Sequence, residues 1–244
     1  MRIIAIDVGG TEIKGALIEG KIVKEFKQYT NQNLGKDSIL STVFNVIDNL
    51  SIGHIDRIGL VSAGAIDPKT GMIVNNRGTM EGWIDFSLKN EIEKRFGINC
   101  FIDNDANGAM IGEMAAYPKV KNAVMITLGT GVGTAVYING DIYRGTNYQV
   151  EFGHTILYPN GKQCTCGKKG CAESYLSGRS LTIQAQTIID DSITHGKDVF
   201  TLYEKHNTKA IQIINEYVFN LATFLESLNC AFDPELFIIG GGVI

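Results

Sequence analysis

Metal-binding residue types are concentrated in one glycine-rich stretch, residues 151–171, EFGHTILYPNGKQCTCGKKGC. The stretch contains one histidine and three cysteines, His154, Cys164, Cys166 and Cys171. Imidazole nitrogens and thiolates are the ligands that zinc prefers, and four of them form a closed, structural tetrahedral site. The pattern predicts a zinc-binding loop that also fixes Glu151, three residues before the histidine. The alternative, a reduced surface loop whose cysteines cluster by chance, requires a rare coincidence.

A second concentration of polar side chains is the segment DNDAN, residues 103–107. It lies between an expected strand over 99–102 and an expected helix over 107–116. An Asp or Asn at such a junction can cap the helix, and capping is the default interpretation of any one of them. Capping needs only one side chain, whereas four are present here, so the junction is a second candidate site. The polar loop 75–83, NNRGTMEGW, carries further groups that could hydrogen-bond a hydroxylated ligand.

Two glycine-rich turns follow apolar runs that read as strands. DVGGT, residues 7–11, follows the run 2–6, and GTGVG, residues 129–133, follows the run 123–128. Turns of this kind present backbone N–H groups, and threonine adds a hydroxyl, to an anion. Asp7 could hold Mg²⁺ through water. Either turn alone is also compatible with an ordinary hairpin.

The two turns belong to a repeated pattern. Residues 3–23 and 123–143 share one order: strand, glycine-threonine turn, strand, two-residue turn, strand. Such a repeat indicates two structurally related domains that face one another. Two glycine turns could also bind a di- or triphosphate from both sides. The spacing of apolar residues predicts further elements: helices over 38–50, 88–96, 179–189 and 210–229, and strands over 57–61 and 235–239.

Composition is that of an ordinary globular protein. The 244 residues are 44% hydrophobic and 20% charged, with a net charge of −4 and no basic run, which does not favour nucleic acid. No apolar segment is long enough to cross a membrane, and the first strand begins at once without a signal peptide, so a cytoplasmic location is expected. In that setting the five cysteines indicate metal binding or buried thiols. Cys100 and Cys230 are expected in the core.

The order of these motifs resembles the ROK family of sugar kinases, in the actin/hexokinase-like ATPase superfamily. The resemblance covers essentially the whole chain, and the combination of EFGH with CTCGKKGC is its most specific part. It implies an α/β protein with the actin-like (ribonuclease H-like) ATPase fold and a cleft between two related domains, a small one over 1–117 and a large one over 118–244 that contains the zinc loop. Family members usually continue for several tens of residues beyond a terminal IIGGG, so part of the large domain is expected to be missing.

The same resemblance implies roles for individual residues. Asp105 would be the catalytic base that takes the proton from the attacking sugar hydroxyl. The sugar-binding residues would be Gly64, Asn75, Asn76, Asn104, Asp105, Glu151, His154 and Glu173. The ATP-binding residues would be Asp7, Gly9, Gly10, Thr11, Lys14, Gly129, Thr130, Gly131, Gly133, Gly240, Gly241 and Gly242. Magnesium would accompany ATP near Asp7, and zinc would bind His154, Cys164, Cys166 and Cys171.

The implied activity is phosphorylation of a hexose by ATP, with glucose the commonest substrate. Mannose, fructose, N-acetylmannosamine and N-acetylglucosamine are alternatives, because selectivity depends on loop geometry that a sequence does not fix. Two alternatives belong to other classes: a sugar-responsive transcriptional regulator and a catalytically inactive sugar-binding protein. Because the first strand is expected directly after Met1, no DNA-binding module is expected ahead of it. The resemblance also implies a homodimer.

Overall fold

The computed structural model describes residues 1–30, 35–75, 82–148 and 150–243. The chain divides into two compact units, which are described one at a time. The first consists of Met1–Gly108 with Arg144–Gln149, and the second of Ala109–Tyr143 with Val150–Ile244. The domain limits of 1–117 and 118–244 stay a prediction, because compactness alone does not show which residues fold together.

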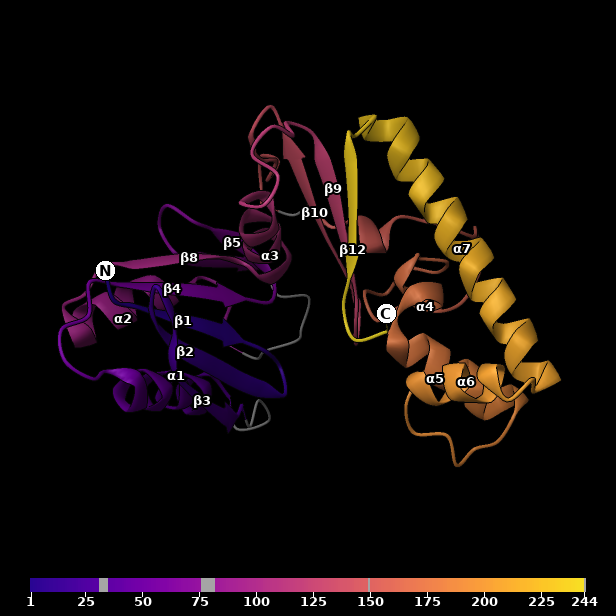
Figure 1. Cartoon of the computed structure of the whole chain (residues 1–244), viewed down its shortest axis with the longest axis horizontal. Helices are drawn as coiled ribbons and strands as arrows, with labels where there is room; N and C mark the ends of the chain where they lie inside the picture. Colours follow the sequence, from indigo (N-terminus) through magenta and orange to yellow (C-terminus); the bar gives the residue numbers. More distant parts are fainter. Residues whose placement is uncertain (31–34, 76–81, 149, 244) are drawn as a thin grey trace. The chain divides into compact units, whose positions relative to one another are not determined.

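The first unit is built on a five-stranded sheet in the order β3-β2-β1-β4-β8 (Figure 1). Its strands are β1 (Ile3–Val8), β2 (Glu12–Glu19), β3 (Lys21–Tyr29), β4 (Arg57–Ser62) and β8 (Cys100–Asn104). The first three pair antiparallel, whereas β4 lies parallel to β1 and β8 parallel to β4. A small sheet of β5 (Ala65–Asp67), β6 (Met72–Asn75) and β7 (Phe86–Ser87) completes the unit.

The second unit repeats the central pattern of the first. Its sheet has the order β11-β10-β9-β12, with strands β9 (Ala123–Leu128), β10 (Val132–Ile138), β11 (Asp141–Ile142) and β12 (Leu236–Gly240). β9, β10 and β11 form an antiparallel meander, and β12 lies parallel to β9 as β4 does to β1. The Asn139-Gly140 turn between β10 and β11 has positive φ at both residues, which suits the twist of a two-residue hairpin. The duplication expected from residues 3–23 and 123–143 is therefore present in the topology.

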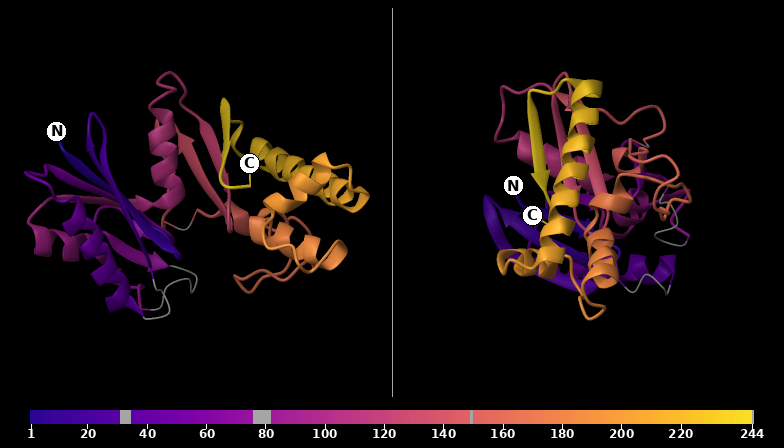
Figure 2. Two further views of the ribbon diagram at one scale, coloured as in Figure 1. Left: turned by 60° about the horizontal axis from the view of Figure 1, so that its bottom comes forward. Right: turned by 90° about the vertical axis from the view of Figure 1, so that its right-hand side faces the viewer.

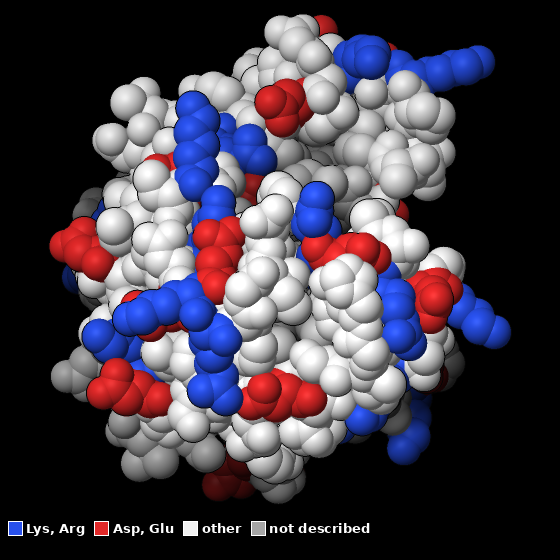
Figure 3. Space-filling model, turned by 90° about the vertical axis from the view of Figure 1, so that its left-hand side faces the viewer, with Lys and Arg blue, Asp and Glu red and all other residues white. Residues whose placement is uncertain are grey.

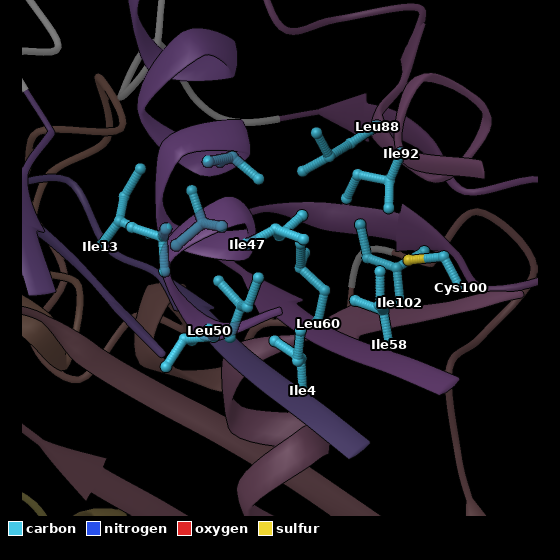
Figure 4. Packing of buried hydrophobic residues seen from close by; sticks show 14 of the residues in the cluster. Ile4, Ile13, Ile47, Leu50, Ile58, Leu60, Leu88, Ile92, Cys100 and Ile102 are labelled. Atoms are coloured by element: carbon cyan, nitrogen blue, oxygen red, sulfur yellow. The ribbon is translucent and has the colours of Figure 1, made fainter. Parts of the chain in front are cut away.

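The core of the first unit lies between its large sheet and two helices, α1 (Lys36–Leu50) and α2 (Leu88–Phe96). Alternate residues of β1 and β2 point into it, as the period of two requires. Figure 4 shows Ile4, Ile58 and Leu60 of the sheet packed with Ile47 of α1. The approach of α1 to β2 is close: a methyl group on Gly15 would lie 2.6 Å from a methyl carbon of Leu50.

The second unit buries one face of its sheet under helices. These are α4 (Glu173–Leu176), α5 (Gly178–Ile188), α6 (Lys197–Glu204) and α7 (Thr208–Phe232). The right-hand view in Figure 2 shows the yellow helix α7 alongside the yellow strand β12. Phe224 and Leu228 of α7 join Val124 and Ile126 of β9 in one buried cluster. The sequence did not predict α6, which has only one buried residue, Val199.

Two local expectations were wrong. α3 begins at Asp105, not at 107, and ends at Met114, so Asp105 lies in the first turn of the helix. Cys230 is exposed on α7, and its thiol lies 3.5 Å from a carboxylate oxygen of Glu226. Cys100 is buried, as expected, and desolvation by that burial raises the pKa of its thiol to about 12.

Charge distribution and helix length were compared with what a nucleic acid or a membrane would require. On the face of the molecule drawn in Figure 3, positive and negative side chains are interspersed. This face therefore supplies no extended basic field for a phosphate backbone. Over the described ranges of the chain, none of the helices combines the length and the apolar character needed to span a bilayer.

Candidate functional site

The histidine and three cysteines of the 151–171 stretch come together in the second unit. Their ligand atoms all lie within 4.8 Å of one another. His154 Nδ1 is 3.5 Å from Cys164 Sγ, and Cys166 Sγ is 3.6 Å from Cys171 Sγ. Cys164 and Cys171 are buried, whereas His154 and Cys166 are partly exposed.

This donor set fits zinc. A tetrahedral site with Zn–S bonds of about 2.3 Å has sulfur–sulfur edges of about 3.8 Å and sulfur–nitrogen edges of about 3.5 Å. The separations of 3.6 Å between the two sulfurs and 3.5 Å between sulfur and nitrogen are close to these values. Desolvation by burial, together with hydrogen bonding to the neighbouring thiols, raises the pKa of Cys171 to about 12 in the absence of an ion. A divalent cation would supply the positive charge that three crowded thiolates require.

Glycines allow tight turns in residues 154–171, the candidate metal-binding segment, which is called the metal loop below. The backbone N–H of Cys164 donates to the Lys168 carbonyl at 2.8 Å, which closes the CTCGK turn. Gly167 and Gly170 have φ of 88° and 83°, a region that favours glycine. A methyl group on Gly170 would collide with the Tyr158 carbonyl oxygen. The CxCGxxGC spacing is therefore a requirement of the backbone as well as of the ligands.

The second ring nitrogen of His154 faces a carboxylate. His154 Nε2 lies 3.4 Å from Glu151 Oε2, across one turn of the 3-10 helix Phe152–His154. A carboxylate on the far nitrogen of a metal-binding histidine fixes the tautomer and the ring orientation. The EFGH motif thus places Glu151 beside Nε2 of His154, the ring nitrogen other than the one that lies near Cys164.

Gly153 of the same motif packs against the end of the second glycine turn. A methyl group there would lie 2.3 Å from the Val132 carbonyl oxygen. The backbone N–H of Phe152 donates to Thr134 Oγ1 of β10 at 3.0 Å. The EFGH segment is therefore in direct contact with the end of the glycine turn and with β10.

We expect Gly153→Ala to lower the free energy of unfolding by about 1–3 kcal/mol, because the added methyl group must displace backbone. The same replacement at Gly112 of α3 is the matched control: a methyl group there meets nothing within 4 Å. In a helix interior that change should be neutral or stabilising by up to about 1 kcal/mol. Urea unfolding of both variants measures the difference. Equal stability of the two variants would contradict a tight contact at Gly153.

Glu173 joins the metal loop to the glycine turn on the other side. Its Oε2 accepts the backbone N–H of Val132 at 3.2 Å, and its Oε1 accepts the Thr165 hydroxyl at 3.2 Å. The carboxylate lies so close to the turn that a methyl group on Gly131 would be 2.6 Å from Oε2. Glu173, predicted to bind sugar, is thus also a structural acceptor for the turn.

We expect Glu173→Ala to release the Val132 amide, since it removes the acceptor of that N–H. An unpaired, part-buried donor costs about 1–3 kcal/mol, so hydrogen exchange of this amide should rise by roughly tenfold or more. Glu173→Gln is the matched control, because its amide oxygen can still accept the bond. Unchanged exchange in the alanine variant would show that the bond does not hold the turn.

Three glycine-containing segments of the second unit lie side by side: residues 128–129, Gly178 and residues 241–243. The Gly178 N–H, at the start of α5, donates to the Gly129 carbonyl at 2.7 Å. The Val243 N–H donates to the Leu128 carbonyl at 3.0 Å, and Gly241 has φ of 109° with no room for a side chain against Leu128. The turn predicted to bind phosphate and the glycine triplet predicted to bind the adenosine side are therefore neighbours.

The first glycine turn is ordered within the first unit. Buried Thr30 closes it: its hydroxyl donates to the Gly9 carbonyl at 2.7 Å and its N–H to the Thr11 carbonyl at 2.9 Å. Asp7 is paired in register with Lys14 across β1 and β2. Asp7 is exposed, yet partial desolvation by the surrounding protein raises the pKa of its carboxylate, and the charge of Lys14 opposes that rise.

The DNDAN junction forms a network at the end of β8. Asn104 caps α3: its Oδ1 accepts the backbone N–H groups of Ala106 and Asn107 at 3.0 and 3.2 Å. Its Nδ2 donates to the Gly64 carbonyl at 3.0 Å, which places Gly64 beside the junction. The Asp105 side chain is exposed, with one oxygen 2.8 Å from the Ala106 N–H. The junction thus presents an accessible carboxylate on a fixed backbone.

Two further residues, Asn75 and Asn76, were also predicted to bind sugar. Asn75 ends β6 and is paired with Ala65 of β5. Asn76 lies outside the described residues. Two residues that sequence reasoning missed are Gly178, which bonds to the Gly129 turn, and Arg144, which pairs with Asp103. The Ser-Gly pair before a helical run could have indicated Gly178, whereas no local signal indicates Arg144.

Comparisons with known proteins place the chain among related sequences. A family model described as the ROK family matches residues 3–244. A glucokinase from Halalkalibacterium halodurans is 34% identical, over 98% of this chain and 80% of its own length. An N-acetylmannosamine kinase from Vibrio vulnificus is 30% identical, over 100% of this chain and 83% of its own. A xylose repressor from Bacillus subtilis is 28% identical, over 99% of this chain and 64% of its own.

A solved structure has the same architecture as this chain. The crystal structure of a ROK family glucokinase from Streptomyces griseus, in complex with glucose and AMPPNP, matches with a TM-score of 0.86 and 29% identity. The match covers 100% of this chain and 84% of that one. The α/β class and the actin-like ATPase fold predicted from the sequence are confirmed.

Proposed function

This chain belongs to the ROK family, and from that premise we propose that it is a kinase that transfers the γ-phosphoryl group of ATP to a sugar hydroxyl. The observation that carries the proposal is the DNDAN junction. There an exposed carboxylate, Asp105, stands on a helix start that Asn104 caps and ties to Gly64. A structural cap alone would not need a second, solvent-accessible acid beside it.

Asp105 is the proposed base. It accepts the proton of the attacking hydroxyl as that oxygen bonds to phosphorus, and the bond between phosphorus and the β–γ bridging oxygen breaks to release ADP. A placed base contributes about 10²–10⁴ in rate. Asn104 hydrogen-bonds the sugar next to the attacking oxygen and holds it in reach. Because phosphoryl transfer has little covalent chemistry for the protein to perform, positioning and charge stabilisation account for the rest.

The glycine turns are the proposed phosphate-binding elements. Residues 129–133 lie next to the N-terminus of α5, where the helix dipole favours anions. The triplet 240–242, bonded to the same edge of the second sheet, takes the adenosine side. Residues 7–11 form the other turn, next to Lys14 of β2, and Asp7 would hold Mg²⁺ there through water. Magnesium, when bound with ATP, neutralises charge on the β- and γ-phosphates.

Selection of one hydroxyl among several requires a rigid set of hydrogen bonds to the others. We propose that Glu151, His154 and Glu173 supply them, with Gly64, Asn75 and Asn76 contributing from the first unit. His154 and Cys164, Cys166 and Cys171 would hold zinc, whose role here is structural: it fixes the EFGH segment and leaves no open ligand position for chemistry.

Glucose is the proposed substrate. Its support is the similarity to a glucokinase, the more similar of the two kinases compared, at 34% against 30% identity. N-acetylmannosamine is the specific alternative, because the match to the N-acetylmannosamine kinase covers the whole chain. A homodimer stays a prediction, which light scattering of the purified protein would test.

A sugar-responsive repressor is the alternative from another class, supported by the similarity to the xylose repressor. An inactive sugar-binding protein is the third. An assay that couples ADP release to NADH oxidation, run over hexoses and N-acetylhexosamines, separates the kinase from the two alternatives. The kinase proposal predicts sugar-dependent ADP release, fastest with glucose. Sugar binding by calorimetry without ADP release would support the inactive protein, and a specific shift of operator DNA the repressor.

A further inference from the structure

Asp103, the residue before the Asn104–Asp105 pair, is a buried carboxylate that uses both oxygens. Only 8% of the residue is exposed. Its Oδ1 accepts the backbone N–H of Asn104 at 2.8 Å and Asn107 Nδ2 at 2.9 Å. Its Oδ2 accepts two N–H groups of the Arg144 guanidinium, from Nε at 3.1 Å and from a terminal nitrogen at 2.6 Å. Burial of this charge is thus matched by four donors and one opposite charge.

The donors of Oδ1 lie on either side of Asp105. Asn104 precedes it and caps α3, and Asn107 lies in the first turn of the same helix. Asp103 therefore fixes the backbone before Asp105 and a side chain after it. The helix is also pressed onto the sheet, because a methyl group on Gly108 would lie 2.3 Å from a methyl carbon of Val61. The orientation of Asp103 consequently sets the direction in which α3, and the Asp105 side chain, leave β8.

Arg144 comes from a part of the chain distant in sequence. It follows β11, a strand of the second unit, yet the segment Arg144–Gln149 belongs to the first compact unit. A second contact holds this segment: the Tyr148 hydroxyl and the Asp67 carboxylate of β5 share a hydrogen bond. Tyr148 has φ of 56°, an unfavourable value for a tyrosine that such a contact can maintain. The segment that carries Arg144 is thus attached to the first unit at two points.

We propose that Arg144 is a positioning residue for Asp105: it orients the Asp103 carboxylate and, through it, the start of α3. This inference rests on the proposed kinase activity for its role in the reaction. A guanidinium fork on a buried carboxylate is directional, whereas an ammonium group is a point charge. Small errors in the placement of a catalytic group are costly, since a shift of about 1 Å can lower the rate by about 10²-fold.

If Arg144 has a purely structural role, a different result is expected. In that case Arg144 only compensates a buried charge, and removing both charges together should repair the damage. The pair of variants Arg144→Met and Asp103→Asn/Arg144→Met separates the two roles. Methionine keeps the aliphatic stem but donates no hydrogen bond, and asparagine keeps the shape of Asp103 without its charge.

With the full chain and saturating sugar and ATP, we expect Arg144→Met to lower kcat by about tenfold to a hundredfold, with KM for both substrates within about twofold. Arg144→Lys should recover part of the loss. In the double variant, the midpoint of urea unfolding should return toward that of the unaltered protein, while kcat stays about tenfold or more below it. Arg95→Met is the matched control: it removes an exposed ion pair to Asp48, 2.9 Å long, and should leave kcat unchanged.

The amide signals of residues 104–107 in a ¹H–¹⁵N NMR spectrum give a readout that needs no activity. They should shift in Arg144→Met and not in Arg95→Met. A kcat within twofold in Arg144→Met, a kcat restored in the double variant, or unshifted amides would each overturn the proposal. If the unaltered protein phosphorylates no sugar, the kinase activity itself fails, and the amide signals alone then decide whether Arg144 orients the start of α3.

Discussion

Asp105→Ala should lower kcat by about 10²–10⁴-fold, because it removes the group that accepts the proton of the attacking hydroxyl. The side chain is exposed, and its nearby hydrogen bond, to the Ala106 N–H, lies within the first turn of α3. The helix keeps its cap, since Asn104 still accepts the N–H groups of Ala106 and Asn107. The fold and the metal content should therefore be unchanged.

Asp37→Ala is the matched control for that variant. Asp37 is also an exposed acid in the first turn of a helix of the first unit, α1. Both variants lose the same favourable interaction of a carboxylate with a helix N-terminus. Steady-state kinetics should show a kcat within about twofold of the unaltered enzyme for Asp37→Ala and a collapse only for Asp105→Ala. A near-normal kcat in Asp105→Ala would remove this residue as the base.

After loss of Asp105, loss of the metal site should have the largest effect on the protein's function. Cys164→Ser replaces a buried sulfur that lies 3.5 Å from His154 Nδ1. With only three good ligands left, zinc binding should weaken by several orders of magnitude, and the thermal midpoint of unfolding should fall, because metal binding is coupled to folding of the loop. Sugar affinity should drop by about 10–100-fold, since His154 and Glu151 lose the ion that orients them.

Cys230→Ser is the control for this prediction, because Cys230 is exposed on α7, in an element that carries no metal ligand. Metal content by elemental analysis, sugar affinity by calorimetry and thermal unfolding should all be unchanged in that variant. Chelation of the unaltered protein should reproduce the Cys164→Ser result. A demetallated protein that stays folded and binds sugar normally would reduce the loop to a structural crosslink with no part in the sugar site.

Much of the fold follows from local patterns in the sequence. The alternation in β1 and the apolar spacing in α2 are strong signals because one face of each element is buried. The bounds of α2 and β9 agree with the predicted 88–96 and 123–128. The cluster of His154 with three cysteines was also predictable, since these residue types are rare and their spacing is constrained by glycine turns.

What could not be predicted depends on contacts between distant parts of the chain. The ion pair of Asp103 with Arg144 joins residues 41 apart, and the bond from Val132 to Glu173 spans the same separation. Neither residue pair has a local signature, because an arginine or glutamate between apolar runs is usually solvated. α6 was missed because an eight-residue helix with one buried side chain has little periodicity to detect. The early start of α3 was missed because any of several polar residues could have been the cap.

Transfer of phosphate from ATP to a sugar is tested most directly by ³¹P NMR of the reaction mixture. The protein is incubated with Mg²⁺-ATP and glucose, and then with N-acetylmannosamine. The proposed function predicts that a sugar phosphate monoester and ADP appear in equal amounts, with no ADP formed when the sugar is left out. Formation of free inorganic phosphate in place of the monoester, or an unchanged ATP spectrum with every sugar tried, would contradict it.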